Sequence, residues 1–233
     1  MIIKMSDLNL CVIGHIKTLF PTKFGVPRQS GLVKDLPAKI IMEPKFRTKE
    51  AFRGLEGYSH IWLIWEFSEA KKENWSATVR PPRLGGNTKM GVFATRSPFR
   101  PNPIGLSCVR LDRIEYTEND GPILHVLGAD LMDNTPILDI KPYIPFADCV
   151  SEATAGFAGE RFSHALEVDI PAKILERIPT QLQGALAEVL SQDPVPAYKK
   201  DPCRVYGFEF SDFEIKFQTD GKTLTVVDII SRK

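Results

Sequence analysis

Short runs of β-branched and aromatic residues, separated by turn residues, dominate the chain between residues 10 and 143. Runs of this kind, without the longer period of an amphipathic helix, predict β-strands. We expect seven strands, at residues 10–16, 36–42, 58–67, 89–95, 104–116, 123–129 and 135–143. Asn119, Asp120 and Gly121, between the fifth and sixth strands, are a strong hairpin signal. The pattern predicts a mainly β fold, an antiparallel single-sheet β-barrel of about seven strands.

The pattern changes towards the C-terminus, where small and polar residues at 149–159 predict a linker. A strand is then expected at 166–170, and helix between residues 171 and 192 with an interruption near Pro179. Three more strands are expected at 205–210, 213–218 and 224–230. We therefore predict two domains: residues 1–150 form the barrel, and residues 151–233 form the linker and a small α+β domain.

Composition narrows the class of protein. Of the 233 residues, 43% are hydrophobic and 25% are charged, which is typical of a globular chain of one large or two modest domains. No apolar run approaches a transmembrane span, and the N-terminus lacks the apolar core of a signal peptide. Four scattered cysteines and four dispersed histidines show no disulfide or zinc spacing. We expect a cytoplasmic protein with reduced thiols and no bound metal.

The most unusual segment is rich in proline, glycine and arginine. The whole chain has a net charge of +1, yet residues 80–113 hold seven basic residues and one acid. Three prolines between residues 98 and 103 fix φ and bias their preceding residues towards extended conformations, so Arg96, Arg100 and Asn102 lie on a stiff segment. Arginine forks bind carboxylates and phosphates. We interpret the segment as a preorganised anion-binding loop; the alternative is a rigid structural loop with solvated arginines.

Residues 91–105, Gly-Val-Phe-Ala-Thr-Arg-Ser-Pro-Phe-Arg-Pro-Asn-Pro-Ile-Gly, closely resemble the signature of the TsaA/TrmO-like family. Blocks at residues 24–29, 54–62, 78–86 and 130–146 resemble the same family, in the same order. Five ordered blocks are far more specific than one short motif. The tail from about residue 165 is similar, more weakly, to the extra C-terminal domain of the bacterial members.

The resemblance implies an S-adenosylmethionine-dependent tRNA methyltransferase, built on a β-barrel and forming a homodimer. Its expected reaction is the methylation of N6 of a threonylcarbamoyl-modified adenosine next to the tRNA anticodon. The strand pattern alone would not suggest a nucleotide cofactor, because the βαβ alternation and the glycine motif of a Rossmann fold are absent. Two alternatives remain open: a non-catalytic RNA-binding barrel, and a methyltransferase with a small-molecule acceptor.

The same resemblance, taken motif by motif, implies which residues form the site. The cofactor-binding positions are Arg28, Gln29, Ser30, Phe67, Ser68, Arg96, Leu106, Leu127, Gly128, Ala129 and Asp130. Relatives often have Pro at the position of Ser30 and His at that of Ser68, so a contact from Ser68 would come from its backbone. The expected substrate-binding residues are Arg100, Asn102 and Lys141.

If the reaction uses a general base, the candidates are Asp133 and Asp139, with Tyr143 as a polar orienting group. The alternative for Asp133 is turn chemistry, because Asp-Asn-Thr-Pro is a good turn sequence. We also expect the C-terminal domain to grip the tRNA backbone through its basic residues, against the alternative of a solvated polar face. Those residues are Lys199, Lys200, Arg204, Lys216, Lys222, Arg232 and Lys233.

Overall fold

The computed structural model describes residues 9–70, 75–81, 84, 87–161, 165–195 and 201–232. Six strands close into an antiparallel barrel in the order β1-β2-β7-β6-β3-β8. They are β1 (Gly14–Lys17), β2 (Pro37–Met42), β3 (His60–Glu66), β6 (Ile104–Thr117), β7 (Gly121–Leu127) and β8 (Thr135–Pro142). The expected mainly β fold with an antiparallel barrel is confirmed.

The barrel has six strands rather than about seven, and the prediction for residues 89–95 is wrong. There the chain forms the two-residue strand β5 (Met90–Gly91), which pairs with β4 (Thr78–Val79) outside the barrel, and then the 3-10 turn η6 (Val92–Ala94). Val92 is buried, but Phe93 and Ala94 are both exposed, so the run lacks the alternation that a barrel strand needs. The prolines that follow also remove the donors of a continued ladder.

Short helical turns lie in the described connections between these strands. They are the 3-10 turns η1 (Pro44–Phe46), η2 (Lys49–Phe52), η3 (Leu55–Gly57) and η4 (Ser68–Ala70). Inward-facing aliphatic residues such as Ile40, Leu63 and Leu124 fill the barrel. On β3 the burial alternates: Leu63 points inward, whereas Trp62 and Ile64 lie half-buried on the outer face. An apolar strand therefore carries hydrophobic side chains on both faces.

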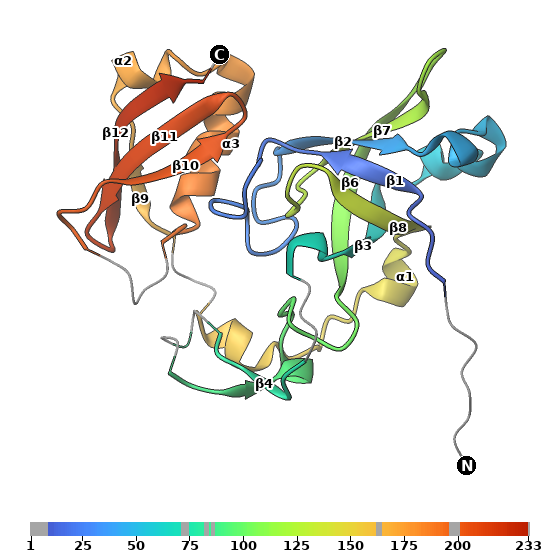
Figure 1. Ribbon diagram of the computed structural model, residues 1–233, viewed down its shortest axis with the longest axis horizontal. Helices are drawn as coiled ribbons and strands as arrows, with labels where there is room; N and C mark the ends of the chain where they lie inside the picture. Colours follow the sequence, from blue (N-terminus) through green and yellow to red (C-terminus); the bar gives the residue numbers. More distant parts are fainter. Residues whose placement is uncertain are drawn as a thin grey trace.

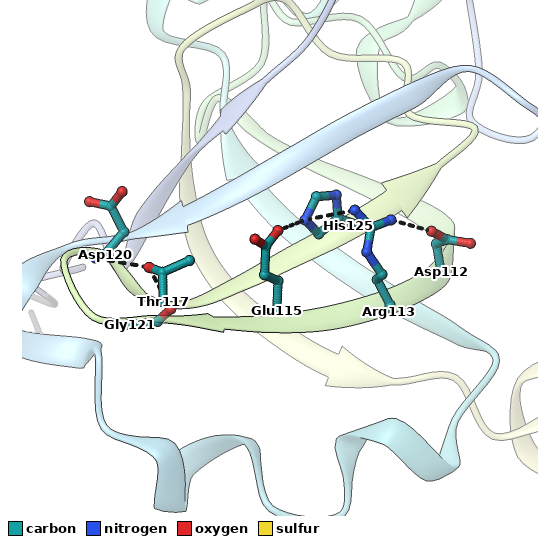
Figure 2. Close-up of polar contacts among 7 residues, drawn as sticks. All are labelled: Asp112, Arg113, Glu115, Thr117, Asp120, Gly121 and His125. Carbon is teal, nitrogen blue, oxygen red and sulfur yellow. Dashed lines mark hydrogen bonds and ion pairs between the residues drawn. The ribbon is translucent and has the colours of Figure 1, made fainter. Parts of the chain in front are cut away.

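Strands β6 and β7 form a long hairpin whose outer face is held by charged contacts. In Figure 2, Arg113 lies between Asp112 and His125, and Glu115 contacts the same imidazole at 2.6 Å. The expected turn begins where the Thr117 hydroxyl accepts the Asp120 N–H at 3.0 Å. Because His125 is buried, these polar partners satisfy an imidazole that the sheet alone would leave unpaired.

The C-terminal part is a second sheet, in the order β10-β11-β12-β9, with helices on one face (Figure 1). Its elements are β9 (Glu167–Asp169), α2 (Ala172–Leu175), α3 (Thr180–Ser191), β10 (Tyr206–Phe210), β11 (Phe213–Thr219) and β12 (Thr223–Ser231). The short helices α1 (Pro145–Asp148) and η7 (Gly156–Arg161) occupy the region between the two sheets in sequence. Helix stops near Pro179, as expected, because α3 begins at Thr180.

The barrel has a hydrophobic core of its own, but the loop between β1 and β2 packs into the core of the C-terminal part, which we therefore call the shared core. Phe20, Val33 and Leu36, which precede β2, are buried together with C-terminal residues of β10 and α3. The Phe20 and Phe210 rings pack edge to face at 5.8 Å. The Ser211 N–H donates to the Leu19 carbonyl at 2.7 Å. Figure 1 shows this blue loop reaching from the barrel towards α3. The C-terminal sheet therefore supports the segment that includes residues 28–30.

A matched pair of glycine substitutions tests this contact. Gly25 (φ 92°) and Gly54 (φ 88°) both need positive φ, but a Cβ on Gly25 would lie 2.3 Å from the Phe208 ring, whereas Gly54 has open space around it. Gly25→Ala should lower the free energy of unfolding by about 1–3 kcal/mol more than Gly54→Ala, because it adds overpacking to the same backbone strain. Urea denaturation measures both. Equal losses would contradict the shared core.

Candidate functional site

Two adjoining clefts open beside the arginine-rich loop. The barrel-mouth cleft, of about 1510 Å³, lies where segments 26–29, 65–70, 93–106 and 130–136 converge. The interdomain cleft, of about 1850 Å³, is bounded by the same loop, by residues 75–81 and by residues 189–194 of the C-terminal part. Arg28, Gln29, Phe93, Arg96 and Arg100 line both. One loop therefore forms a wall of two neighbouring cavities.

Ten of the expected site residues gather in the barrel-mouth cleft. They are Arg28, Gln29, Phe67, Ser68, Arg96, Arg100, Asn102, Leu106, Asp130 and Asp133. They come from four segments that are separated in sequence by up to about a hundred residues, and closure of the barrel brings them together. The cleft also has apolar surface, because the Phe67 ring packs on Trp65 at 4.2 Å and Leu106 is exposed beside it.

The arginine-rich loop is held by its own polar contacts. The Arg100 guanidinium donates through Nη1 to the Thr95 carbonyl at 3.0 Å, and the Thr95 hydroxyl donates to the Val92 carbonyl at 2.9 Å. The Ser97 N–H donates to that same hydroxyl at 3.3 Å. Together with the prolines, these bonds limit the conformations available to the loop, so a ligand that it binds would order little further chain.

A chain of hydrogen bonds joins this loop to the C-terminal part. Arg96 Nη1 donates to Gln29 Oε1, and Gln29 Nε2 donates to the Arg28 carbonyl at 2.5 Å. Arg28 Nη2 in turn donates to the Asp193 carbonyl at 3.0 Å. The two arginines expected at the cofactor are thus linked through Gln29, and the C-terminal part fixes one end of the link.

A half-buried carboxyl group, that of Asp130, lines the wall of this cleft. Trp65 Nε1 donates to the Ser107 hydroxyl at 2.9 Å, and that hydroxyl donates to Asp130 Oδ1 at 2.5 Å. Burial raises the pKa of Asp130, while bonds from Ser107 and from the backbone of Asp130 and Ser30, and the charge of Arg96, lower it in part. Ser107, only 1% exposed, was not expected from sequence. The sequence signal that could have indicated it is a serine at a position of the expected strand that faces inward.

Four expected cofactor positions lie outside the cleft lining. The Ser30 hydroxyl accepts the Cys108 N–H at 3.1 Å and so attaches its segment to β6. Leu127, Gly128 and Ala129 lie under residues 31–36, where the Gly128 carbonyl accepts the Gly31 N–H at 2.9 Å. The Gly128 N–H also donates to the Leu36 carbonyl at 2.9 Å. In this structure these hydrogen bonds position the cleft wall.

The three expected catalytic residues lie in two places. Asp133 faces the cleft, where its Oδ1 accepts the Thr18 N–H at 3.0 Å and Lys17 Nζ lies 3.5 Å from its Oδ2. Asp139 pairs with Lys141 at 2.8 Å on the outer face of the barrel. The Tyr143 ring packs near Trp62 at 5.7 Å, and its pKa is raised by burial and then by the nearby Cys149 and Cys108. Neither Asp139 nor Tyr143, nor Lys141, lines the clefts described above.

The residues that the structure describes were also compared with the requirements of a metal site and of a membrane span. No group of three or more His, Cys, Asp or Glu side chains in that part of the chain could hold a metal ion. Its helices include none long and apolar enough to cross a membrane.

Comparison with known proteins agrees with this geometry. Residues 15–149 match the family model described as the tRNA-methyltransferase O N-terminal domain, and residues 161–232 match the TrmO C-terminal domain. The chain belongs to the TrmO family. This confirms the resemblance seen in the sequence blocks.

Relatives of the TrmO-family chain match over almost its full length. A tRNA (adenine(37)-N6)-methyltransferase of Escherichia coli K12 is 41% identical over 222 residues, which covers 92% of this chain and 94% of the relative. A putative S-adenosylmethionine-dependent methyltransferase of Pseudomonas aeruginosa is 40% identical over 210 residues, 87% of this chain and 89% of the relative. The crystal structure of TrmO from P. aeruginosa superposes with a TM-score of 0.79 at 31% identity, covering 98% and 99% of the chains.

The half-buried carboxyl group of Asp130 should make the stability of this TrmO-family protein depend on pH. Because the folded-state pKa of Asp130 is raised above its ordinary value of 3.8, the unfolded chain releases this proton at lower pH than the folded one. Wild-type stability relative to Asp130→Asn should therefore fall as pH rises from about 4 through the raised pKa, and then level off. Urea titrations from pH 4 to pH 8 measure the difference, with the surface substitution Asp35→Asn as a control. A difference that is constant with pH would contradict the burial of the charge.

Proposed function

We propose that this chain is an S-adenosylmethionine-dependent tRNA methyltransferase that modifies N6 of an adenosine at position 37, beside the anticodon. The observation that carries the proposal is 41% identity, over 92% of the chain, to an E. coli protein with that name. The gathering of ten motif residues in one cleft supports it independently. A non-catalytic RNA-binding barrel and a small-molecule methyltransferase are not favoured, because both family-model matches are to a tRNA methyltransferase family.

The barrel-mouth cleft fits the proposed cofactor. S-adenosylmethionine supplies an electrophilic methyl group on a sulfonium centre. Phe67 and Leu106 offer the apolar surface that an adenine needs, and Arg96 offers a guanidinium fork for a carboxylate. Asp130, whose half-buried carboxyl already accepts bonds from Ser107 and from the Ser30 backbone, fixes the adjoining wall. The residues present therefore suit both ends of such a ligand.

We further propose that the target adenosine carries a threonylcarbamoyl group. Arg100 lines the cleft, and its bond to the Thr95 carbonyl uses one of five guanidinium N–H groups, so the fork can also bind the carboxylate of that group. The N6–H of such an adenosine belongs to a urea-like group and is easier to remove than that of a plain amine. Asp133, the candidate base that faces the cleft, would accept this proton, while alignment supplies most of the rate.

Two substitutions separate cofactor binding from chemistry. Arg96→Ala should weaken the binding of S-adenosylmethionine by about tenfold or more, because it removes a charged hydrogen bond. Asp133→Asn should keep cofactor affinity and lower the methylation rate of threonylcarbamoylated tRNA by about a hundredfold. Calorimetry and transfer of a radioactive methyl group measure the two effects. If Asp133→Asn turns over at nearly the wild-type rate, Asp133 is not the base and only stabilises the turn. A wild-type protein that binds no cofactor would overturn the proposal.

We also propose a homodimer, assembled through an apolar outer face of the barrel. On this face Ile104 and Leu106 of β6 are exposed next to half-buried Trp62 and Ile64 of β3. Trp62 Nε1 donates to Asp148 of α1 at 3.0 Å, which places α1, with Phe146 93% exposed, at the edge of the same face. An exposed apolar surface of this kind is typical of an interface. Asp139, Lys141 and Tyr143 lie on or beside this face, and Leu106 also lines the cleft.

The assembly is tested by sedimentation at micromolar concentration. The wild-type chain should sediment as a dimer, and Phe146→Ser should shift it towards monomer, because the substitution removes a large apolar contact. Tyr116→Ser changes an exposed aromatic residue on the β6–β7 hairpin and serves as the matched control. A wild-type monomer would contradict the proposal.

The two-domain division at residue 150 and the cytoplasmic location are proposals of the same kind, and so is the tRNA contact of the C-terminal part. Among the basic residues expected there, Arg232 pairs with Glu209, and Arg204 lies over the Tyr206 ring at 5.4 Å. Lys216 and Lys222 lie on or next to the sheet, while Lys199, Lys200 and Lys233 lie outside the described residues. Because the shared core includes Phe20, point substitutions test this contact better than truncation does.

A further inference from the structure

Two large aromatic side chains are exposed together beside the clefts. Trp75 is 53% exposed and Phe93 is 75% exposed, and their rings lie 6.2 Å apart with a tilt of 34°. We call this pair the aromatic platform. Neither residue belongs to the barrel core or to the proposed dimer face. Burial of two large aromatic rings would stabilise the fold through the hydrophobic effect. Because these two rings stay exposed, the pair suggests a ligand-binding surface.

Local structure fixes the platform in place. Val92, next to Phe93, is buried, and its N–H donates to the Ala77 carbonyl at 2.9 Å. The pairing of β4 with β5 continues this link, so the chain around Trp75 and the chain around Phe93 are joined side by side. The buried valine anchors the 3-10 turn, whereas Phe93 in the same turn is exposed. The platform is therefore a built surface with a defined orientation.

The platform stands at the junction of the two clefts. Phe93 lines both of them, and Trp75 lines the interdomain cleft. Phe93 is also only three residues before Arg96, which we place at the cofactor. A group stacked on the platform would thus lie directly beside the nucleoside that enters the barrel-mouth cleft.

The charge around the platform favours a polyanion. Among the described residues that line the interdomain cleft, the basic ones are Lys23, Arg28, Arg80, Arg96 and Arg100, and the acidic one is Glu66. A second copy of this chain would bring the same positive charge to the same surface, and like charges repel. A nucleic-acid backbone would instead be attracted to it.

We propose that Trp75 and Phe93 stack on an unpaired base of the RNA that neighbours the methylated adenosine, while the surrounding arginines hold its phosphates. This inference rests on the proposed function and deepens it. Proteins recognise unpaired RNA bases by stacking them on aromatic side chains. An adenosine must leave its stack before its N6 can reach a cleft, and the platform gives the exposed neighbouring base a new partner.

The test is a double-mutant cycle between protein and RNA. The probe is a synthetic anticodon stem-loop that carries threonylcarbamoyladenosine, alone or with an abasic nucleotide on the 5′ or the 3′ side of it. Full-length wild-type protein, Trp75→Ala and Phe93→Ala are compared by fluorescence anisotropy. Each aromatic substitution should weaken binding of the intact stem-loop on the order of tenfold. One abasic stem-loop should bind the wild type as weakly, and should lose no more affinity when Trp75 is replaced.

Controls separate this inference from the function on which it rests. Tyr116→Ala removes an exposed aromatic residue away from the clefts and should bind the stem-loop like the wild type. Calorimetry with S-adenosylmethionine should give the wild-type affinity for Trp75→Ala, which establishes that the variant is folded. If the wild type methylates the stem-loop and both platform variants bind it equally well, the stacking role is overturned and the proposed function stands.

Three further outcomes overturn the inference in other ways. If Trp75→Ala leaves RNA affinity unchanged but converts a dimer to a monomer in sedimentation, the platform is a contact between copies. If the wild type neither binds nor methylates the stem-loop, the proposed function fails, and the stacking role fails with it. Additive losses from the abasic nucleotide and from Trp75→Ala would mean that the base and the ring do not touch.

Discussion

The packing of residues 18–36 against the C-terminal sheet is the contact on which the site depends. Phe20 lies against Phe210, and the backbone of Gly25 is so close to the Phe208 ring that no side chain fits between them. The segment that follows carries Arg28 and Gln29 into the barrel-mouth cleft. This segment forms no helix or strand of its own, so its conformation depends on contacts with other parts of the chain. Two separate sheets hold it, so the C-terminal part contributes to the cleft even where it does not line it.

This arrangement also explains how the charged groups of the site are held in fixed positions. A carboxyl group that loses part of its hydration, such as Asp130, costs free energy unless hydrogen bonds and opposite charge offset that loss. Here Ser107, the Ser30 backbone and the Arg96 charge supply that offset. Because Ser30 is attached to β6 and Arg96 is attached to Gln29, the polar network spans the barrel, the arginine-rich loop and the supported segment. Movement of any one of them would leave a buried polar group unsatisfied.

The sequence predicted the barrel well because its strands depend on local pattern, as in β6 and β7 with their hairpin turn. It failed at residues 89–95, where only Val92 is buried and burial, not composition, decides the structure. The clustering of Arg28, Arg96 and Asp130 followed from family motifs, not from periodicity. The role of Ser107 could not be predicted from the sequence, because it depends on the register in which β6 pairs with β3. The contact between Gly25 and Phe208 joins residues 183 positions apart, and no local pattern contains it.

The stiffness of the arginine-rich loop has a reason in this geometry. A single short segment carries Phe93, Arg96 and Arg100, which face two clefts at once. If the loop were mobile, binding in one cleft would have to order it before the other could be used, and each ordered side chain would cost affinity. The loop is instead fixed during folding, by its prolines, by the contacts of Thr95 and by the bond from Arg96 to Gln29. The base and the nucleoside that we propose would then meet surfaces whose separation is set beforehand, so that binding itself helps to align N6 with the methyl group.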